Sequence, residues 1–504
     1  MSSDHTSRPL SLAKRTSSRS ILRNLLARRA DPDAPRRVLS KEEAQALALF
    51  VYDIVKSPSV AVTIHHRATS VVTQRHGHAP RSIDVDDLDL FWGTRLGSAV
   101  DVTITTNVRD IAALRRVMQR AIANQTPPMA GPLADEGPDP TDMPRPATYA
   151  PVSLWYPSTI AAIASERGTA ITALLDPLEN TAWQGIGTVA LSAQSFWNYT
   201  AEGATPAWGE LTDVEISLSV RAADGSASGW SGQANRDWSK LRPAQVAQTA
   251  LANAEQQRNP SRAEPGRYTA ILSPTAMGQM WYAAAHLFNV QANSPFNPPT
   301  YKGVGDKDRR GERVMDPRVI LSSDPTDPEG GDWPFFYGDG GMGEPNAKSV
   351  WVENGILKLR SVDAGTGMGY GMIPRKDPWA MRMNGGPSTV AEMITKCERG
   401  IYVHRFANLE VIDGNSGAMS GYTRDGCLLI MNGKISRPVK DFRIFESPFL
   451  MLNRLIALGK PERIAFGFTP PKPFDTSARW PLPPMIVPPV MVTDFNFSAL
   501  ADAI

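Results

Sequence analysis

The stretch SVWVENGILKLRSVD, residues 349–363, decides how the second half of this chain folds. Two short runs rich in apolar residues flank Asn354-Gly355. A two-residue hairpin turn requires positive φ at both central residues, and an asparagine followed by a glycine tolerates this best. The stretch therefore predicts an antiparallel β-hairpin.

The same pattern continues along the chain. A second Asn-Gly pair, Asn432-Gly433, divides CLLIMNGKISRPV at residues 427–439. Short apolar runs also occur in GIYVHRF, residues 400–406, and LEVIDGNSG, residues 409–417. We therefore predict a C-terminal domain over residues 263–504 that is largely antiparallel β.

The N-terminal residues 39–125 alternate between helical and strand patterns. Ser40 and Glu43 form a capping-box pattern before a predicted helix over 42–56, and 108–125 is amphipathic at helical spacing. Strands are predicted at 60–65, at its neighbour 70–77, and at 99–106. This region is expected to be a mixed α/β domain.

Two further segments complete the predicted organisation. Residues 126–151 contain eight prolines and are predicted to be a linker, because proline removes backbone donors and fixes φ.

The middle region, 152–262, is predicted to be α/β. Its predicted elements are helices at 158–175 and 242–257 and strand pairs at 187–203 and 213–230. Residues 1–38 are predicted to be a basic, disordered tail, and the alternative is an arm for an anionic partner. The expected fold class is α+β.

Composition restricts the functional classes. The 504 residues carry 53 basic and 51 acidic side chains, a net charge of +2, which predicts no nucleic-acid or membrane partner. No apolar run is long enough to span a bilayer, and Arg23 interrupts the apolar segment of the basic N-terminus. Cys397 and Cys427 are expected to be reduced thiols in the cytoplasm, although a disulfide between them is an alternative.

Local motifs for catalysis are few. No G-x-S-x-G nucleophile motif is present, which argues against a serine hydrolase. His76 and His78, followed by four aspartates, form either a solvated loop or a metal or substrate contact. His65 and His66 are adjacent in a strand, so their side chains point to opposite faces and a joint site is not expected.

Taken together in their order, six segments resemble the TldD/PmbA family, also called modulators of DNA gyrase. The hairpin at 349–363 and ERGIYVHRF at 398–406 are two of them. The others are PGRYTAILSPTAM (265–277), RVILSSDPT (318–326), the segment 416–459 and PPMIVPPVMVTDF (483–495). The resemblance extends over residues 45–495 and implies two kinds of subunit. One is a zinc peptidase with H-E-x-x-x-H on a helix and a distal cysteine, and the other lacks these residues and pairs with the first.

The residues expected at the metal motif favour the second kind of subunit. If His286 takes the place of the first histidine, the general base falls on Leu287 and the second histidine on Gln291. Leucine cannot accept a proton, and glutamine is a poor zinc ligand. The distal region 459–480 contains no cysteine. We therefore expect no catalytic or metal-binding residue in this chain. His286 is interpreted as a core or interface histidine, and the alternative is a metal ligand with partners from elsewhere.

The resemblance implies a non-catalytic subunit that shapes the chamber and holds an extended peptide for a zinc-bearing TldD-like paralogue. This chain is expected to bind no cofactor, and the zinc is expected in the partner. The glycine-rich stretch 330–345 is interpreted as a β-rich loop, in which Trp333, Phe335, Phe336 and Tyr337 either line a substrate groove or pack internally. Two alternatives remain: an autonomous hydrolase with an altered metal site, or a scaffold protein without enzymatic activity.

Overall fold

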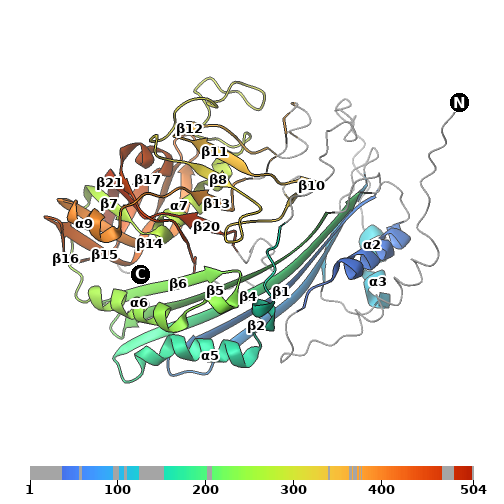
Figure 1. Ribbon diagram of the computed structural model, residues 1–504, viewed down its shortest axis with the longest axis horizontal. Coiled ribbons are helices and arrows are strands. Elements are labelled where there is room, and N and C mark those ends of the chain that lie inside the picture. Colours follow the sequence, from blue (N-terminus) through green and yellow to red (C-terminus); the bar gives the residue numbers. More distant parts are fainter. Residues whose placement is uncertain are drawn as a thin grey trace. The chain divides into compact units, whose positions relative to one another are not determined.

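A computed structural model shows the arrangement of the chain (Figure 1). It describes residues 37–55, 60–94, 102–106, 111–123, 152–200, 207–338, 341–362, 366, 370, 372–373, 375, 377–467 and 482–501. The predicted linker lies outside these residues, and so do nearly all of the predicted tail and positions 468–480 of the distal region. No helix among the described residues is long and apolar enough to cross a membrane.

The chain divides into two compact units, each built from separate segments. The smaller unit comprises Met1–Thr69, Asp84–Glu136 and Ala193–Leu211. The larger unit comprises Ser70–Ile83, Gly137–Ser192 and Thr212–Ile504. A six-stranded sheet has the order β3-β2-β1-β4-β5-β6, and four of its strands contribute residues to both units. These strands are β1 (Val60–Arg75), β2 (Arg81–Thr94), β3 (Val102–Thr106), β4 (Trp183–Thr200), β5 (Ala207–Ala222) and β6 (Ser228–Asn235).

In the smaller unit two predicted helices are confirmed, α2 (Lys41–Val55) and α3 (Ile111–Ala123). The capping box forms as expected, because the Ser40 amide donates to Glu43 at 2.9 Å and the Glu43 amide donates to the Ser40 hydroxyl at 3.3 Å. The apolar faces of both helices are buried in one core.

The prediction of separate strands at 60–65 and 70–77 was wrong, because β1 continues without interruption from Val60 to Arg75. Residues 66–69, between the two predicted strands, include no glycine, proline or asparagine that would favour a turn. The chain reverses only at Gly77, between β1 and β2, where φ is +73°.

Two predictions for the middle region also need correction. The helix over 158–175 is broken into α4 (Pro157–Ala161) and α5 (Ala164–Leu175), because Ile163 is extended with ψ of 175°. Buried Arg167 donates to the Ala162 carbonyl at 2.6 Å and stabilises the break. Where a strand pair was predicted at 187–203, residues 187–200 instead belong to the single strand β4, and 201–203 lie outside the described residues. Strands β5 and β6 form the second predicted pair.

The helix predicted at 242–257 is confirmed as α6 (Pro243–Gln256), and it packs closely against β6. A Cβ atom on Gly229 of β6 would lie 2.2 Å from the Ala254 backbone nitrogen, so only glycine permits this approach. Helices α5 and α6 share a buried apolar core with β4 and β5.

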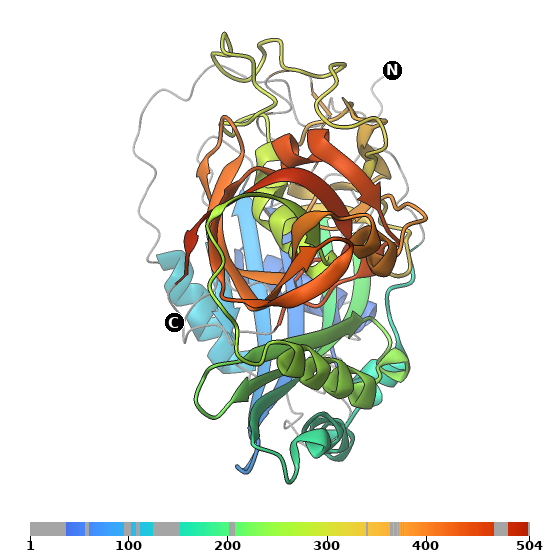
Figure 2. The same cartoon turned by 90° about the vertical axis from the view of Figure 1, so that its left-hand side faces the viewer.

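A closed ring of five strands forms the centre of the C-terminal region (Figure 2). Its order is β14-β7-β21-β17-β15, and β15 pairs again with β14. The ring strands are β7 (Gly266–Leu272), β14 (Arg399–Asp413), β15 (Ala418–Met431), β17 (Phe442–Glu446) and β21 (Val490–Leu500). Two more strands flank it, β16 (Lys434–Val439) beside β15 and β18 (Leu455–Leu458) beside β21. Closure leaves few free strand edges in this part of the fold.

A second six-stranded sheet has the order β12-β11-β8-β13-β20-β19. Its strands are β8 (Leu321–Ser323), β11 (Ser349–Glu353), β12 (Ile356–Leu357), β13 (Met381–Met383), β19 (Glu462–Arg463) and β20 (Met485–Val487). The hairpin prediction from 349–363 is confirmed, with φ of 50° at Asn354 and 75° at Gly355, and Asn432-Gly433 turns in the same way. A two-stranded hairpin, β9 (Phe335–Gly338) and β10 (Gly341–Pro345), and short helices α9 (Val390–Thr395) and α10 (Pro448–Met451) complete this region. The predicted α+β fold class is confirmed.

Candidate functional site

The helix that follows β7 is the element on which the family resemblance expects the metal motif. It is α7 (Pro274–Ala284), and it tightens into a 3-10 turn, η4 (Ala285–Phe288). Ser273 caps its beginning by accepting from the Ala276 amide at 3.1 Å, and Pro274 occupies the first turn. Met280 and Trp281 are fully buried, and the Trp281 ring contacts Phe449 edge-on at 5.5 Å.

A buried arginine holds the other end of this helix. Arg360 is 0% exposed in its side chain and donates to the carbonyls of Phe288 at 3.3 Å and Asn289 at 2.5 Å. Asp308 lies 3.8 Å from its guanidinium. Burial lowers the pKa of Arg360, and the nearby Asp308 carboxylate opposes that shift. A cation at the last carbonyls of a helix is electrostatically favourable, so Arg360 fixes the position of the residues just before it.

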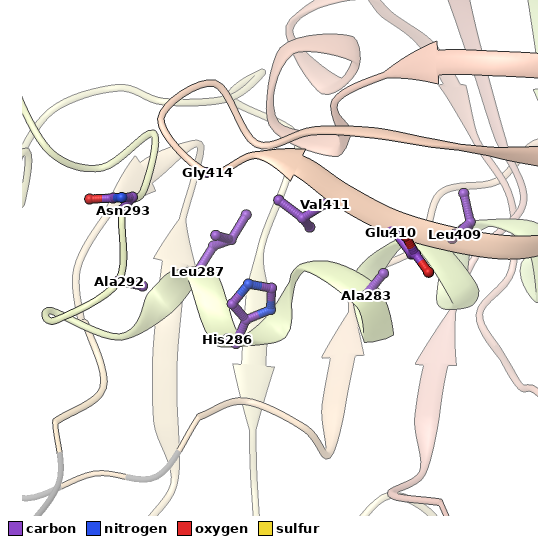
Figure 3. A pocket seen from close by; sticks show the side chains of 9 residues that line it. All are labelled: Ala283, His286, Leu287, Ala292, Asn293, Leu409, Glu410, Val411 and Gly414. Atoms are coloured by element: carbon purple, nitrogen blue, oxygen red, sulfur yellow. The ribbon is translucent and has the colours of Figure 1, made fainter.

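A pocket of about 560 Å³ opens beside this helix end (Figure 3). The helix contributes one wall, β14 contributes the opposite wall, and the loop after η4 and the turn after β14 close one side. The lining residues are Ala283, His286, Leu287, Ala292, Asn293, Leu409, Glu410, Val411 and Gly414. Gly414 is required at its place, because a Cβ atom there would lie 2.3 Å from the Asn293 carbonyl oxygen.

The edge of β14 borders this pocket. β14 pairs with β15 along most of its length but with β7 only from Gly400 to Val403. Further along, the Phe406 amide donates to the Gln279 side chain of α7 at 2.8 Å. Within the described chain, no strand pairs with the remainder of this edge. Three consecutive residues, 409–411, line the pocket, as expected where a strand presents its edge.

The three residues expected at the metal motif do not form a metal site. His286 is half-buried and lines the pocket, Leu287 is 1% exposed and packs in the core, and Gln291 lies beyond the helix. Gln291 instead donates its side-chain amide to the Thr366 hydroxyl at 2.9 Å.

Residues around this helix do not fit zinc in any register. Positions 274–291 contain one histidine, His286, and no aspartate, glutamate or cysteine. A catalytic zinc needs three protein ligands and an adjacent base. Across the described part of the chain, no group of three histidine, cysteine, aspartate or glutamate side chains is placed to hold a metal ion.

The histidines at 65, 66 and 76 each have a different partner. His65 bonds Gln194 at 2.8 Å, and His66 bonds Asp86 at 2.5 Å. Burial lowers the pKa of His65 to about 4. His76 lies 3.3 Å from Glu179. Asp86 is thus a partner of His66, and the aspartates after His78 form no metal cluster with it among the described residues.

The aromatic residues proposed for a substrate groove lie on β9 and just before it. Trp333 and Phe335 stack with ring centres 5.7 Å apart, and Phe335 is fully buried. Neither belongs to the pocket lining in Figure 3. The side chains of Phe336 and Tyr337 fall outside the described part, although their backbone forms β9.

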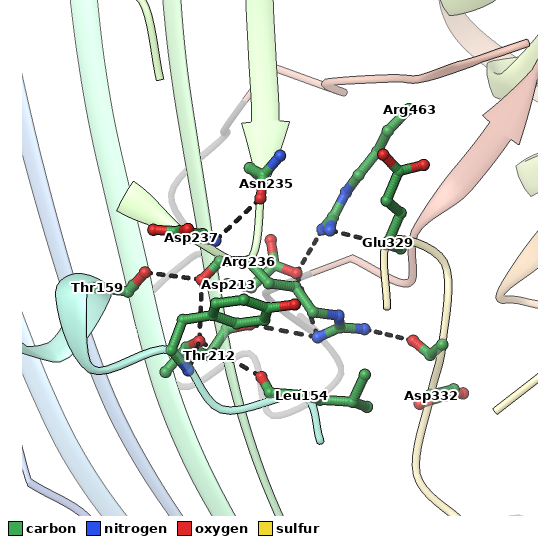
Figure 4. A network of polar contacts seen from close by, with 12 residues as sticks. Leu154, Thr159, Thr212, Asp213, Asn235, Arg236, Asp237, Glu329, Asp332 and Arg463 are labelled. Atoms are coloured by element: carbon green, nitrogen blue, oxygen red, sulfur yellow. Dashed lines mark hydrogen bonds and ion pairs between the residues drawn. The ribbon is translucent and has the colours of Figure 1, made fainter. Parts of the chain in front are cut away.

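A buried charge network was missed at the sequence level (Figure 4). Arg236 donates to the carbonyls of Thr212, at 3.2 Å, and Gly331, and it lies 3.6 Å from Asp213. Arg463 bonds the same Asp213 carboxylate and also donates to the Glu329 carbonyl at 3.0 Å. The network therefore joins β5, β6 and β19 to the loop that leads into the aromatic stretch.

Comparisons with known proteins agree with the sequence resemblance. Residues 265–499 match the family model described as the PmbA/TldA metallopeptidase C-terminal domain. No protein with curated annotation matches the chain.

Three solved structures share the fold. A candidate modulator of DNA gyrase from Bacteroides thetaiotaomicron has a TM-score of 0.69 and 16% identity, over 91% of this chain and 100% of that one. A similar candidate from Thermotoga maritima has a TM-score of 0.66 and 16% identity, over 89% and 99%. TldE from Thermococcus kodakarensis has a TM-score of 0.66 and 14% identity, over the same shares. The family model therefore identifies residues 265–499 as a C-terminal domain of the PmbA/TldD type.

Proposed function

We propose that this chain is the zinc-free subunit of a two-component PmbA/TldD-type peptidase. It holds extended peptide for a zinc-bearing paralogue and completes the chamber in which that partner works. The chain itself supplies no hydrolytic group, and the metal belongs to the partner.

The observation that carries this proposal is the composition of α7 and η4. The helix is built and capped as a rigid element, and a pocket opens beside its end. Its only histidine is His286, and it has no acidic residue to act as a general base. An element with this packing and without the catalytic groups suits a subunit that binds and does not cleave.

The edge of β14 suggests how peptide is held. An extended peptide adds to an open strand edge through main-chain hydrogen bonds, and alternate side chains enter neighbouring pockets. Beyond Phe406 the β14 edge has no strand partner in the described part of the chain, and the pocket lies alongside it. Main-chain binding would accept many sequences, as a peptidase chamber requires.

The proposed complex is cytoplasmic. Cys397 and Cys427 are buried free thiols, and burial raises the pKa of both. Unpaired, inert thiols are common in reducing compartments.

Co-purification with a paralogue that carries H-E-x-x-x-H tests this proposal. Each chain is purified without chelators, alone and mixed, and its mass is measured by light scattering after size-exclusion chromatography. We expect a stable heteromer, and elemental analysis should find zinc in the paralogue but less than about one-tenth equivalent in this chain alone.

The matched control is the paralogue with both motif histidines replaced by alanine. This variant should lose zinc while the zinc content of the present chain stays unchanged. Separate elution of the two chains would reject the partnership, and about one zinc per isolated chain would reject the zinc-free assignment.

A further inference from the structure

The pocket beside α7 has a lining with one charged group. Its walls are polar and apolar in about equal measure, and the polar side chains are His286, Asn293 and Glu410. Only Glu410 carries a full charge among the nine lining residues. Its volume of about 560 Å³ lies within the range of roughly 300–1,000 Å³ that is usual for ligand sites.

The carboxylate of Glu410 is available to a ligand. The Glu410 side chain is exposed, and its carboxylate forms no hydrogen bond or ion pair with another described residue. Arg443 comes near through the strand register, but its Nε donates to Ser420, the residue opposite Glu410, at 3.0 Å. Figure 3 shows the Glu410 side chain extending toward Ala283, with the His286 ring beside the same space.

This chemistry suits a long side chain with an aliphatic stem and a cationic head. Ala283 and Val411, both only half-buried, provide apolar surface for the stem, in the way that arginine and lysine stems cover apolar residues. A planar guanidinium can stack on a flat ring and bond a carboxylate through two N–H groups, whereas an ammonium makes a point contact. An arginine side chain can therefore stack on His286 and bond Glu410 at the same time.

We propose that this pocket holds an arginine side chain of the extended peptide that lies along the β14 edge. The stem packs between Ala283 and Val411, and the guanidinium bonds Glu410 while it rests on the His286 ring. This inference rests on the proposed peptide-holding function. It adds a side-chain preference to binding that is otherwise made by the main chain.

The test measures binding of four fluorescent pentapeptides to the full chain by anisotropy. Each is alanine with a central arginine, lysine, leucine or glutamate. We expect the arginine peptide to bind about fivefold more tightly than the leucine peptide, since an exposed ion pair contributes up to about 1 kcal/mol. Lysine should be intermediate, glutamate weakest, and the preference should shrink at high salt.

Substitutions assign the preference to the pocket. Glu410→Gln should remove the arginine preference and change leucine-peptide binding less than about twofold. Glu398→Gln is the matched control, because Glu398 is an exposed glutamate just before the other end of β14. It should bind all four peptides as the wild type does. Val411→Trp should fill the pocket and weaken all four, and circular dichroism melting checks that each variant is folded.

Several results would overturn the inference. They are equal affinity for the arginine and glutamate peptides, an unchanged preference in Glu410→Gln, or no saturable binding by the wild type. Loss of the preference in Glu398→Gln would place it outside the pocket. Co-elution with the paralogue is measured separately. If co-elution holds without the preference, only the pocket inference fails; if the preference holds without co-elution, the subunit role fails.

Discussion

Glu215 shows what sequence could and could not reveal about a single residue. Asp213 and Glu215 alternate with Val214 and Ile216, so the sequence places both acids on the polar face of a strand and does not show that they are buried. Their partners are not visible in the sequence either, because Arg463, Phe466 and Gly467 come from about 250 residues further along the chain. Glu215 accepts the amides of Phe466 at 3.1 Å and Gly467 at 2.8 Å.

Glu215 should make stability depend on pH. Burial raises its pKa from 4.5 to about 7, so the folded chain holds a proton that the unfolded chain releases within this window. Its contribution to the free energy of unfolding is therefore largest at low pH and falls as pH rises toward 7. In Glu215→Gln this dependence disappears. Relative to the variant, the wild type should lose up to about 3 kcal/mol between about pH 5 and pH 8, measured by urea denaturation.

Glu398→Gln is the control for this measurement, because Glu398 is exposed. Its difference from the wild type should stay constant across the same pH range. A constant difference for Glu215→Gln as well would show that Glu215 is ionised throughout.

At the scale of helices and strands, the sequence predicted an element correctly where its turn or cap residues are characteristic. The two Asn-Gly hairpins and the Ser40–Glu43 capping box were predicted correctly because the deciding residues are adjacent in sequence. The break between α4 and α5 was missed, because it depends on Arg167, which is buried by tertiary packing. The pocket was also missed, since β14 and α7 meet only through the closed sheet.

The contact between β6 and α6 gives a test at this scale. Gly229→Ala should lower the free energy of unfolding by about 2 kcal/mol or more, because the added methyl overlaps the α6 backbone at Ala254. The measurement is chemical denaturation followed by circular dichroism.

Gly168→Ala is the control, since Gly168 lies in α5 with no atom within 4 Å of an added Cβ. It should raise the free energy of unfolding by about 0.5–1 kcal/mol through helix propensity. Equal effects for the two substitutions would contradict the close packing of β6 on α6.

At the scale of the whole molecule, the family resemblance predicted more of the fold than the pattern of apolar and polar residues could. Alternation predicted antiparallel strands, but the order β14-β7-β21-β17-β15 and its closure join segments more than 200 residues apart. The six segments that carried the resemblance include β7, β15 and β17 of the ring completely and β14 and β21 in part. The absence of a second histidine from positions 274–291 was readable directly, because it depends on residue identity and not on geometry.

Reconstitution of peptidase activity tests the central claim most directly. An unstructured peptide is incubated with zinc and this chain, with the H-E-x-x-x-H paralogue, with both, or with both when the paralogue's motif glutamate is replaced by glutamine. We expect cleavage to be fastest with both intact chains. It should fall by at least about a hundredfold with the glutamine variant, and the present chain alone should give none. Zinc-dependent cleavage by this chain alone, at a rate close to that of the mixture, would contradict the account.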